Sequence, residues 1–222
     1  MPATNGRSGA GDLLPTAGFR QLHIELQGVK PAIWRRLLVP ADANLGWLHA
    51  VIQTAMGWTN SHLHQYYAGD KLISDPTFAL KVFEDDPPVL DEGKVRIDEV
   101  LNAPGQKLMY EYDFGDSWGH VITLEAVSQP GLAIEKKAVC IDGAQAAPPE
   151  DCGGVPGYEQ LLNVLKNKKH PEHKAMKQWL GGPFDPESFS LRKTNPWLAK
   201  LRWPRVTQAA LRKVLMARDA SR

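Results

Sequence analysis

Apolar and polar residues alternate along residues 19–26, the first patterned stretch of the chain. Leu22, Ile24 and Leu26 share one face, and strict alternation of this kind is typical of a half-buried β-strand. A second apolar run over residues 33–39 follows a short turn. Together the two runs predict neighbouring antiparallel strands.

The spacing of apolar residues changes after Asn44, from every second position to every third or fourth. This spacing predicts a core helix over residues 45–56, with Asn44 as its N-cap and Gly57 at its end. Residues 61–68 are then expected to form a strand. A short helix is expected over residues 98–101.

Two alternating runs, residues 107–114 and 121–127, flank the turn residues Gly115, Asp116 and Ser117. A pair of alternating runs separated by a short polar turn predicts a β-hairpin.

Residues 129–157 are rich in proline and glycine and are expected to be an irregular loop. Helices are expected over residues 158–166 and 171–180, and Thr207 is placed to cap a last helix. Strands therefore come early in the chain and helices late. This order predicts an α+β fold, a single domain with a mainly antiparallel sheet and helices packed against it.

Length and composition fit one soluble globular domain, because the 222 residues are 43% hydrophobic and 23% charged. Residues 1–18 are small and polar and are expected to be a flexible arm, ahead of an α+β domain over residues 19–193. Residues 194–222 are expected to form a basic C-terminal appendage with a short helix. We find no apolar run that resembles a spanning helix or a signal peptide, so no membrane association and a cytoplasmic location are expected.

Charge is unevenly distributed although the net charge is only +1. From residue 190 to the end, nine Lys and Arg face a single acidic residue. Such a tail either binds a polyanion such as DNA or RNA or folds back on an acidic surface of its own domain. The residues nominated for nucleic-acid binding are Lys200, Arg202, Trp203, Arg205, Arg212 and Lys213.

Histidine, aspartate and cysteine gather in three parts of the chain. On a strand over residues 61–68, His62 and His64 would point to the same face, and Asp113 and His120 would flank the hairpin turn. Neutral imidazoles with a carboxylate suit one divalent metal ion, zinc first among them. The predicted ligands are His62, His64, Asp116 and His120, and the additional candidates are Asp113, Cys140 and Cys152. The alternative is that the histidines are ordinary surface or packed residues and that both cysteines are free thiols.

Five strings in the chain occur together in a known family. They are GVKPAIWRRLLVP, LGWLHAVIQTAMGWTNSHLHQYYAG, YEYDFGDSWGHVITLE, CIDGAQAAPPEDCGGVPGYEQLL and GGPFDPESF, in this order. The chain thereby resembles the plasmid pRiA4b ORF-3-like family, which implies an association with plasmids and mobile elements and no established activity. The polar positions that the resemblance highlights are His62, His64, Asp113, Asp116, His120, Cys140, Asp142, Glu150 and Asp151.

The function predicted from the sequence is that of an accessory protein of mobile elements, a non-catalytic binding protein acting near nucleic acid. A metal-dependent hydrolase or nuclease with a His and Asp site is the first alternative. A protein-interaction module, with a protein partner for its charged surfaces, is the second.

Overall fold

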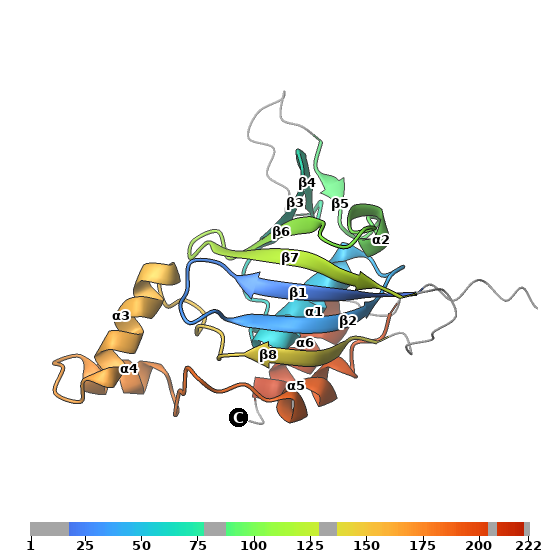
Figure 1. The fold of residues 1–222 in the computed structure, drawn as a ribbon. Helices are drawn as coiled ribbons and strands as arrows, with labels where there is room; N and C mark the ends of the chain where they lie inside the picture. The colour runs from blue at the N-terminus through green and yellow to red at the C-terminus, as the bar shows by residue number, and fades with distance from the viewer. Residues whose placement is uncertain (1–17, 78–87, 129–136, 204–207, 220–222) are drawn as a thin grey trace, which may run out of the picture.

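One sheet of eight strands organises the computed structural model, which describes residues 18–77, 88–128, 137–203 and 208–219 (Figure 1). The strands are β1 (Phe19–Leu26), β2 (Trp34–Pro40), β3 (His64–Ala68), β4 (Lys71–Ser74), β5 (Leu90–Asp91), β6 (Lys107–Tyr112), β7 (Trp118–Val127) and β8 (Val139–Ala144). The helices are α1 (Leu45–Met56), α2 (Ile97–Val100), α3 (Gly154–Lys166), α4 (His173–Trp179), α5 (Leu191–Leu198) and α6 (Gln208–Asp219).

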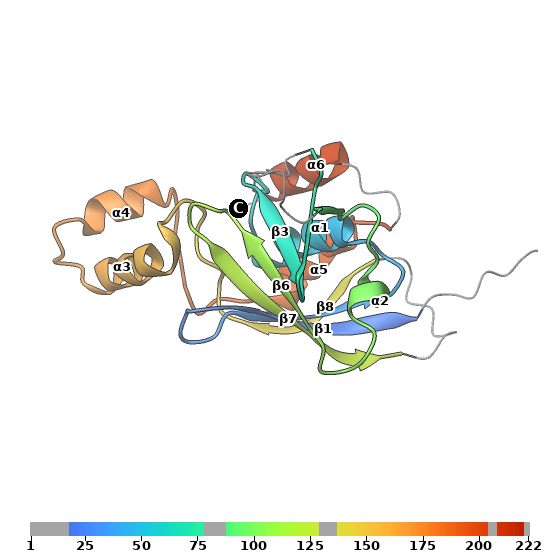
Figure 2. The ribbon, with the colours of Figure 1, turned by 90° about the horizontal axis from the view of Figure 1, so that it is seen from above.

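The strand order is β5-β4-β3-β6-β7-β1-β2-β8, in which β4 and β5 pair in parallel and the other neighbours are antiparallel. Figure 2 shows α1, α5 and α6 on one side of the sheet, whereas α3 and α4 stand beyond its end. The α+β fold with a mainly antiparallel sheet is therefore confirmed, as are the predicted pairings of β1 with β2 and of β6 with β7.

Helix α1 forms the centre of the core, with the caps that the sequence predicts. The side chain of Asn44 accepts a hydrogen bond from the Trp47 amide at 2.8 Å, and Gly57 ends the helix with a φ of 98°. Every residue of α1 except Gly46 is buried. Because the helix is enclosed on all sides, its polar groups must find partners within the protein.

Arg35 and Arg36 are consecutive on β2 and point to opposite faces of the sheet, as strand geometry requires. Arg35 is buried on the inner face, where its Nε donates to the carbonyl oxygen of Ala55 in α1 at 2.9 Å. Arg36 lies on the outer face, with Glu125 at 2.7 Å and Asp142 at 3.1 Å. One arginine therefore ties β2 to the core helix, and the other neutralises acidic side chains on the surface.

A second buried arginine, Arg218 of α6, reaches the C-terminal end of α1. Its Nη2 donates to the carbonyl oxygens of Gly57 at 2.8 Å and Trp58 at 2.6 Å. These carbonyls follow the last turn of the helix, where the backbone carries partial negative charge and lacks intrahelical donors. Arg218 thus supplies a positive charge and hydrogen bonds at the end of α1.

The basic C-terminal segment packs on its own domain. Leu198, Leu201 and Leu215 belong to the hydrophobic core, and the Trp203 ring lies edge-on to Trp47 with centroids 6.4 Å apart. These residues fold back on their own domain through apolar contacts with its core, and not through an acidic surface as the sequence suggests. The remaining exposed cations are considered with the site below.

Two expected elements differ in the structure. The strand expected over residues 61–68 begins only at His64, and the chain before it turns through Asn60 at a φ of 59°. The carbonyl of Leu63 accepts the Asp113 amide at 2.8 Å, which extends the pairing with β6 by one bond. The interval 129–157, expected to be irregular, contains β8, which pairs with β2. A short run between glycine- and proline-rich segments gives little sequence signal for such a strand, because its stability comes from the neighbouring strand.

The arm expected over residues 1–18 lies outside the described residues apart from Gly18, whose carbonyl accepts the Ala41 amide at 2.9 Å. Thr207 also lies outside them. Among the helices of the described segments, none has the length and apolar character needed to cross a membrane.

We expect Arg218→Ala to lower the free energy of unfolding by about 3 kcal/mol, because buried carbonyl oxygens at the end of α1 lose their donors. Urea unfolding measures this change. Lys213→Ala, at an exposed position of the same helix, is the matched control and should stay within about 0.5 kcal/mol of the wild type. Equal effects of the two substitutions would show that Arg218 does not stabilise the helix end.

Candidate functional site

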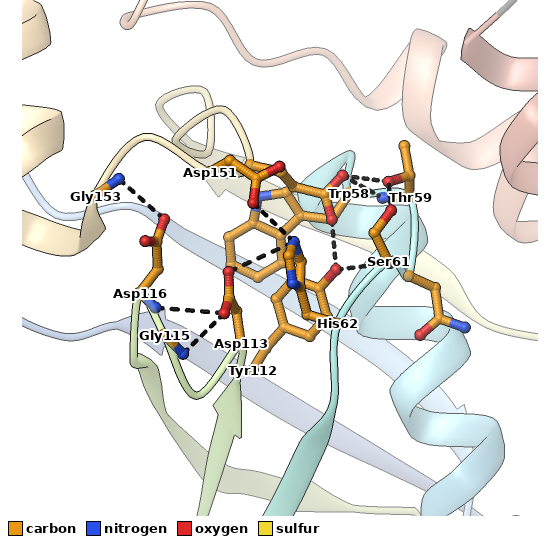
Figure 3. Close-up of polar contacts among 12 residues, drawn as sticks. Trp58, Thr59, Ser61, His62, Tyr112, Asp113, Gly115, Asp116, Asp151 and Gly153 are labelled. Carbon is orange, nitrogen blue, oxygen red and sulfur yellow. Dashed lines mark hydrogen bonds and ion pairs between the residues drawn. The ribbon is translucent and has the colours of Figure 1, made fainter.

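Three polar side chains from separate parts of the chain meet at one end of the sheet (Figure 3). The Nε2 atom of His62 lies 3.2 Å from Oδ1 of Asp151 and 3.6 Å from Oδ2 of Asp113. One donor atom from each of the three residues lies within 4.8 Å of the others. We call these three residues the His62 triad.

His62 is held by the segment that follows α1. The buried indole of Trp58 donates to the carbonyl oxygen of Pro148 at 2.9 Å. The side-chain oxygen of Asn60 lies 2.6 Å from Nε2 of His49, and the backbone amide of Asn60 donates to the side-chain oxygen of Gln53 at 2.9 Å. Buried polar groups of α1 therefore fix the turn that presents His62.

Glu150 fixes the loop that carries Asp151. Its carboxylate accepts hydrogen bonds from the hydroxyls of Tyr112 and Thr59, and from the Thr59 amide at 3.1 Å. The Tyr112 hydroxyl also accepts from the Ser61 amide at 3.0 Å. Because both oxygens of Glu150 already have donors, this residue positions its neighbour Asp151 against His62.

Asp113 uses its two carboxylate oxygens differently. Oδ1 accepts from the amides of Gly115 at 2.9 Å and Asp116 at 3.3 Å, which closes the turn between β6 and β7. Oδ2 faces His62. Asp116 in turn accepts from the amide of Gly153, the N-cap residue of α3, at 3.1 Å. The hairpin turn is thereby joined to the root of α3.

Positive φ values mark the backbone on all three sides of the triad. Asn60, Asp113 and Asp151 have φ angles of 59°, 60° and 59°. Non-glycine residues adopt this conformation rarely, and strain of this kind is often retained at functional sites. The site is thus built by backbone that the surrounding hydrogen bonds hold in place.

The triad has the chemistry of a metal site that is open to solvent. The side chain of Asp151 is 70% exposed, that of His62 is 26% exposed and that of Asp113 is 9% exposed. The Nε2 atom of His62 is nevertheless shielded and makes no hydrogen bond of proper geometry among the described residues. An imidazole nitrogen facing two carboxylate oxygens can hold either a proton or a divalent cation.

His64 is not brought to the triad, although the sequence predicts that it shares a face with His62. It is buried, its ring stacks on His49 with centroids 3.4 Å apart, and its Nε2 lies 2.7 Å from Glu92. Burial lowers the pKa of His64 to about 4 and raises the pKa of Glu92 to about 7. The two histidines separate because β3 begins after His62, so the alternation of a strand does not apply to them.

His120 lies in the core, where burial lowers its pKa to about 4. Its Nδ1 lies 2.9 Å from the carbonyl oxygen of Trp118, and its ring packs edge-on to Trp58 with centroids 5.4 Å apart. Trp58 also stacks on Tyr112, whose ring contacts His62. His120 is therefore not a member of the triad. The rings of Trp58 and Tyr112 pack between it and His62.

Neither cysteine among the predicted ligands belongs to the triad. Cys140 is buried on β8, where its amide donates to Asn195 of α5 at 2.8 Å. Cys152 follows Asp151, and burial, with the charge of Asp116 adding to it, raises the pKa of its thiol to about 12. Both cysteines are free thiols. A protonated Cys152 is a poor metal ligand and nucleophile.

Asp151 is the member of the triad that the predicted ligand set omits. Asp151 is one of the polar positions highlighted by the family resemblance. The spacing along the chain, however, does not show that Asp151 and His62 are neighbours in the fold. The sequence feature that points to Asp151 is the string EDCGG ahead of a helix. Its two glycines, Gly153 and Gly154, permit a positive φ, so the string indicates a tight turn that carries Asp151 at the start of α3.

The predicted nucleic-acid-binding residues are only partly described. Lys200 lies over the Trp197 ring, 3.7 Å from its centroid, and Arg202 and Lys213 are exposed. Trp203 packs against the core as described above. Arg205 and the side chain of Arg212 lie outside the described residues.

A cavity of about 290 Å³ adjoins the triad at Asp151. It lies between the start of α3 and the α4 helix. Its lining residues are Asp151, Cys152, Gly157, Leu161, Glu172, Ala175, Met176 and Trp179. The cavity is therefore mainly apolar and shares one carboxylate with the triad.

Comparison with known proteins gives consistent results. The model of the family described as plasmid pRiA4b ORF-3-like protein matches residues 19–193. The uncharacterized protein y4hQ of Sinorhizobium fredii is 34% identical over 166 residues, which cover 74% of this chain and 82% of that protein. A crystal structure of a protein of unknown function, MM3350 from Methanosarcina mazei Go1, is similar with a TM-score of 0.66 and 33% identity, over 79% of this chain and 95% of that one.

Buried histidines should make the protein less stable in acid. Burial lowers the pKa of His49 to about 3 and those of His64 and His120 to about 4, so the unfolded chain binds protons first as the pH falls. Stability is thus lost from about pH 6.5 towards pH 4, by at most about 1.4 kcal/mol per pH unit for each proton.

Glu92 should oppose this trend. Because its pKa is raised to about 7, the folded state keeps a proton that the unfolded chain releases near pH 4.5, and this contribution is lost as the pH rises through 7. We therefore expect Glu92→Gln to steepen the loss of stability between pH 7 and pH 4.5 in urea unfolding. Glu159→Gln, at an exposed carboxylate of α3, is the control. An unchanged slope in Glu92→Gln would contradict the assigned titration.

Proposed function

This chain belongs to the plasmid pRiA4b ORF-3-like family, and for this member we propose a function as a hydrolase. The hydrolase would depend on one divalent metal ion held by the His62 triad. The names of the relatives assign no activity. The proposal therefore rests on the geometry of the triad, and the single observation that carries it is the convergence of three donor atoms within 4.8 Å.

The donor set favours a catalytic type of metal site. One imidazole nitrogen and two carboxylate oxygens suit zinc, and the two oxygens also suit manganese. Catalytic zinc sites use three protein ligands and leave a further position for water or substrate, whereas structural sites are closed by four. The exposure of Asp151 keeps such a position accessible from solvent.

Preorganisation of the ligands also supports the proposal. Asp113 has one oxygen bound to backbone amides and the other directed at His62, so its orientation is set before any ion arrives. Glu150 holds the loop of Asp151 through the Thr59 and Tyr112 hydroxyls. Ligands fixed by a surrounding shell of hydrogen bonds are characteristic of metal sites with a function.

A metal ion in this position would supply hydroxide at neutral pH by lowering the pKa of the water that it binds, and would polarise a phosphoryl or carbonyl oxygen. The chain itself supplies the ligands and an adjoining apolar cavity next to Asp151. We infer that the scissile bond of a substrate lies over the triad.

A non-catalytic role in binding nucleic acid is the second candidate function. The observation that favours it is the set of exposed cations near the C-terminus, Lys200, Arg202 and Lys213. This candidate requires affinity for nucleic acid without turnover and does not require a metal ion. The two candidates are therefore separated by experiments on metal binding and on hydrolysis.

Titration of metal-free protein with zinc and with manganese tests the metal site. We expect one equivalent to bind the wild type, and we expect His62→Ala and Asp151→Asn each to weaken binding by at least about tenfold, because each removes a ligand. Asp116→Asn is the matched control, since its amide oxygen can still accept from Gly153 and it lies outside the triad. Equal loss in Asp116→Asn and Asp151→Asn, or no binding by the wild type, would refute the metal site.

Hydrolysis of bis(p-nitrophenyl) phosphate and of p-nitrophenyl acetate tests the activity. With zinc or manganese present, turnover is expected in the wild type and in Asp116→Asn. His62→Ala should lose it while keeping the wild-type circular dichroism spectrum, because the residue lies at the surface end of the site. Stoichiometric metal binding without turnover of either substrate would count against the hydrolase and leave a metal-binding protein.

A further inference from the structure

The hairpin of α3 and α4 projects beyond the end of the sheet in both ribbon views (Figures 1 and 2). The two helices pack against each other and are joined by a short turn. Five lysines along this hairpin are exposed: Lys166, Lys168, Lys169, Lys174 and Lys177. Over residues 154–179, which hold the two helices and their turn, the acidic residues are Glu159 and Glu172. We call this projecting, positively charged element the lysine hairpin.

These lysines differ from Arg36 and Arg96, which have acidic partners. Among the ion pairs within the described residues, none involves a lysine of the hairpin, whereas Arg36 and Arg96 are paired with carboxylates. Arg35 and Arg218 are buried and bound to backbone carbonyls. The positive charge of the hairpin is therefore free to attract a polyanion.

The apolar side of the hairpin is turned towards the protein. Leu161 and Val164 of α3 are buried, and Met176 of α4 packs against the core. Trp179, at the end of α4, is the large apolar side chain that remains 49% exposed. A hairpin with inward leucines and outward lysines lacks the apolar face needed to enter a membrane, but an exposed indole beside cations suits stacking on a nucleobase.

The hairpin is rooted at the His62 triad. Asp151 lies two residues before Gly153, the N-cap of α3, and the Gly153 amide donates to Asp116 in the turn between β6 and β7 at 3.1 Å. The 13 residues of α3 span roughly 20 Å, so the lysines at the tip and the triad at the root lie within the length of about six base pairs. Trp179 and Asp151 also line the same cavity at that root.

We propose that the lysine hairpin is the surface on which this chain binds nucleic acid, and that a phosphodiester of the bound strand is the substrate of the His62 triad. The claim that the hairpin binds nucleic acid depends on the hairpin alone. The claim that a phosphodiester is cleaved rests on the proposed function and names its substrate class. In the reaction the oxygen of water bonds to phosphorus and that water releases one proton to solvent, while one P–O ester bond breaks and the released alkoxide takes up a proton from solvent.

Binding is tested by fluorescence anisotropy in EDTA, with labelled single-stranded DNA, duplex DNA and single-stranded RNA of one sequence. The hairpin variant is Lys166→Gln/Lys168→Gln/Lys169→Gln. We expect it to bind at least about tenfold more weakly, and its salt dependence on duplex DNA to decrease by up to about 0.9 in log–log slope for each lysine removed.

The matched control removes the same charge from the C-terminal segment, as Lys200→Gln/Arg202→Gln/Lys213→Gln. It should bind within about twofold of the wild type. Greater loss in this control than in the hairpin variant would overturn the proposal in favour of the C-terminal residues. Failure of the wild type to bind any of the three nucleic acids would overturn it too, as would binding only to vesicles of anionic lipid.

Cleavage of the same labelled nucleic acids with zinc or manganese tests the claim that the substrate is a phosphodiester. Asp151→Asn keeps every lysine, so it should bind in EDTA like the wild type and fail to cleave when metal is added. If the wild type hydrolyses bis(p-nitrophenyl) phosphate and binds nucleic acid but does not cleave it, the substrate assignment is overturned. If nucleic acid, bis(p-nitrophenyl) phosphate and p-nitrophenyl acetate are all left intact, the proposed function fails, whereas the binding result for the hairpin is unaffected.

Discussion

The enclosure of α1 is the constraint on which the rest of this structure depends. A helix buried on all sides cannot leave its polar groups to water, so the carbonyls at its C-terminal end and the side chains of His49 and Gln53 take partners from other elements. Among the described residues, Trp47 Nε1 and Thr54 Oγ1 are the buried side-chain atoms of this helix left without one. Arg35 and Arg218 provide donors for carbonyls at its C-terminal end, and the side chain of Asn44 accepts an amide hydrogen bond at its N-terminal end. These requirements draw β2, the hairpin of β6 and β7, and the C-terminal helix into one core.

The same requirement builds the candidate site. His49 is neutral and buried in α1. The consistent tautomer carries its proton on Nε2, which donates to Asn60, while Nδ1 accepts from the Tyr110 hydroxyl. The turn through Asn60 is thereby fixed, and it presents His62 at the surface. A substitution in the core network would therefore alter the position of His62 without touching the triad.

Local features of the sequence predicted the elements whose stability is local. Asn44 and Gly57 mark the ends of α1 because capping involves residues a few positions apart, and the alternation on β6 and β7 needs only a short turn between them. The expected convergence of His62 and His64 on one ion is not seen, because His62 precedes β3 and faces Asp113 and Asp151, whereas His64 lies buried against His49 and Glu92. His62 and Asp113 were both nominated from the sequence. Their meeting with Asp151 depends on Trp58 and Glu150, which no spacing in the chain reveals.

Charge along the sequence is a poor guide to charge on the surface of this fold. The C-terminal segment has the strongest positive run. Arg218, however, is buried and bound to carbonyls at the end of α1, and Lys200 lies over the indole ring of Trp197. Arginine is well suited to such fixed roles because its planar guanidinium makes several hydrogen bonds at once, whereas lysine keeps a mobile, strongly hydrated charge. The five lysines of the α3–α4 hairpin are fewer than the cations of the tail, but they are carried on a projecting element with two acidic residues, Glu159 and Glu172. The availability of the charge, rather than its density along the chain, therefore points to the hairpin as the site where an anionic partner binds.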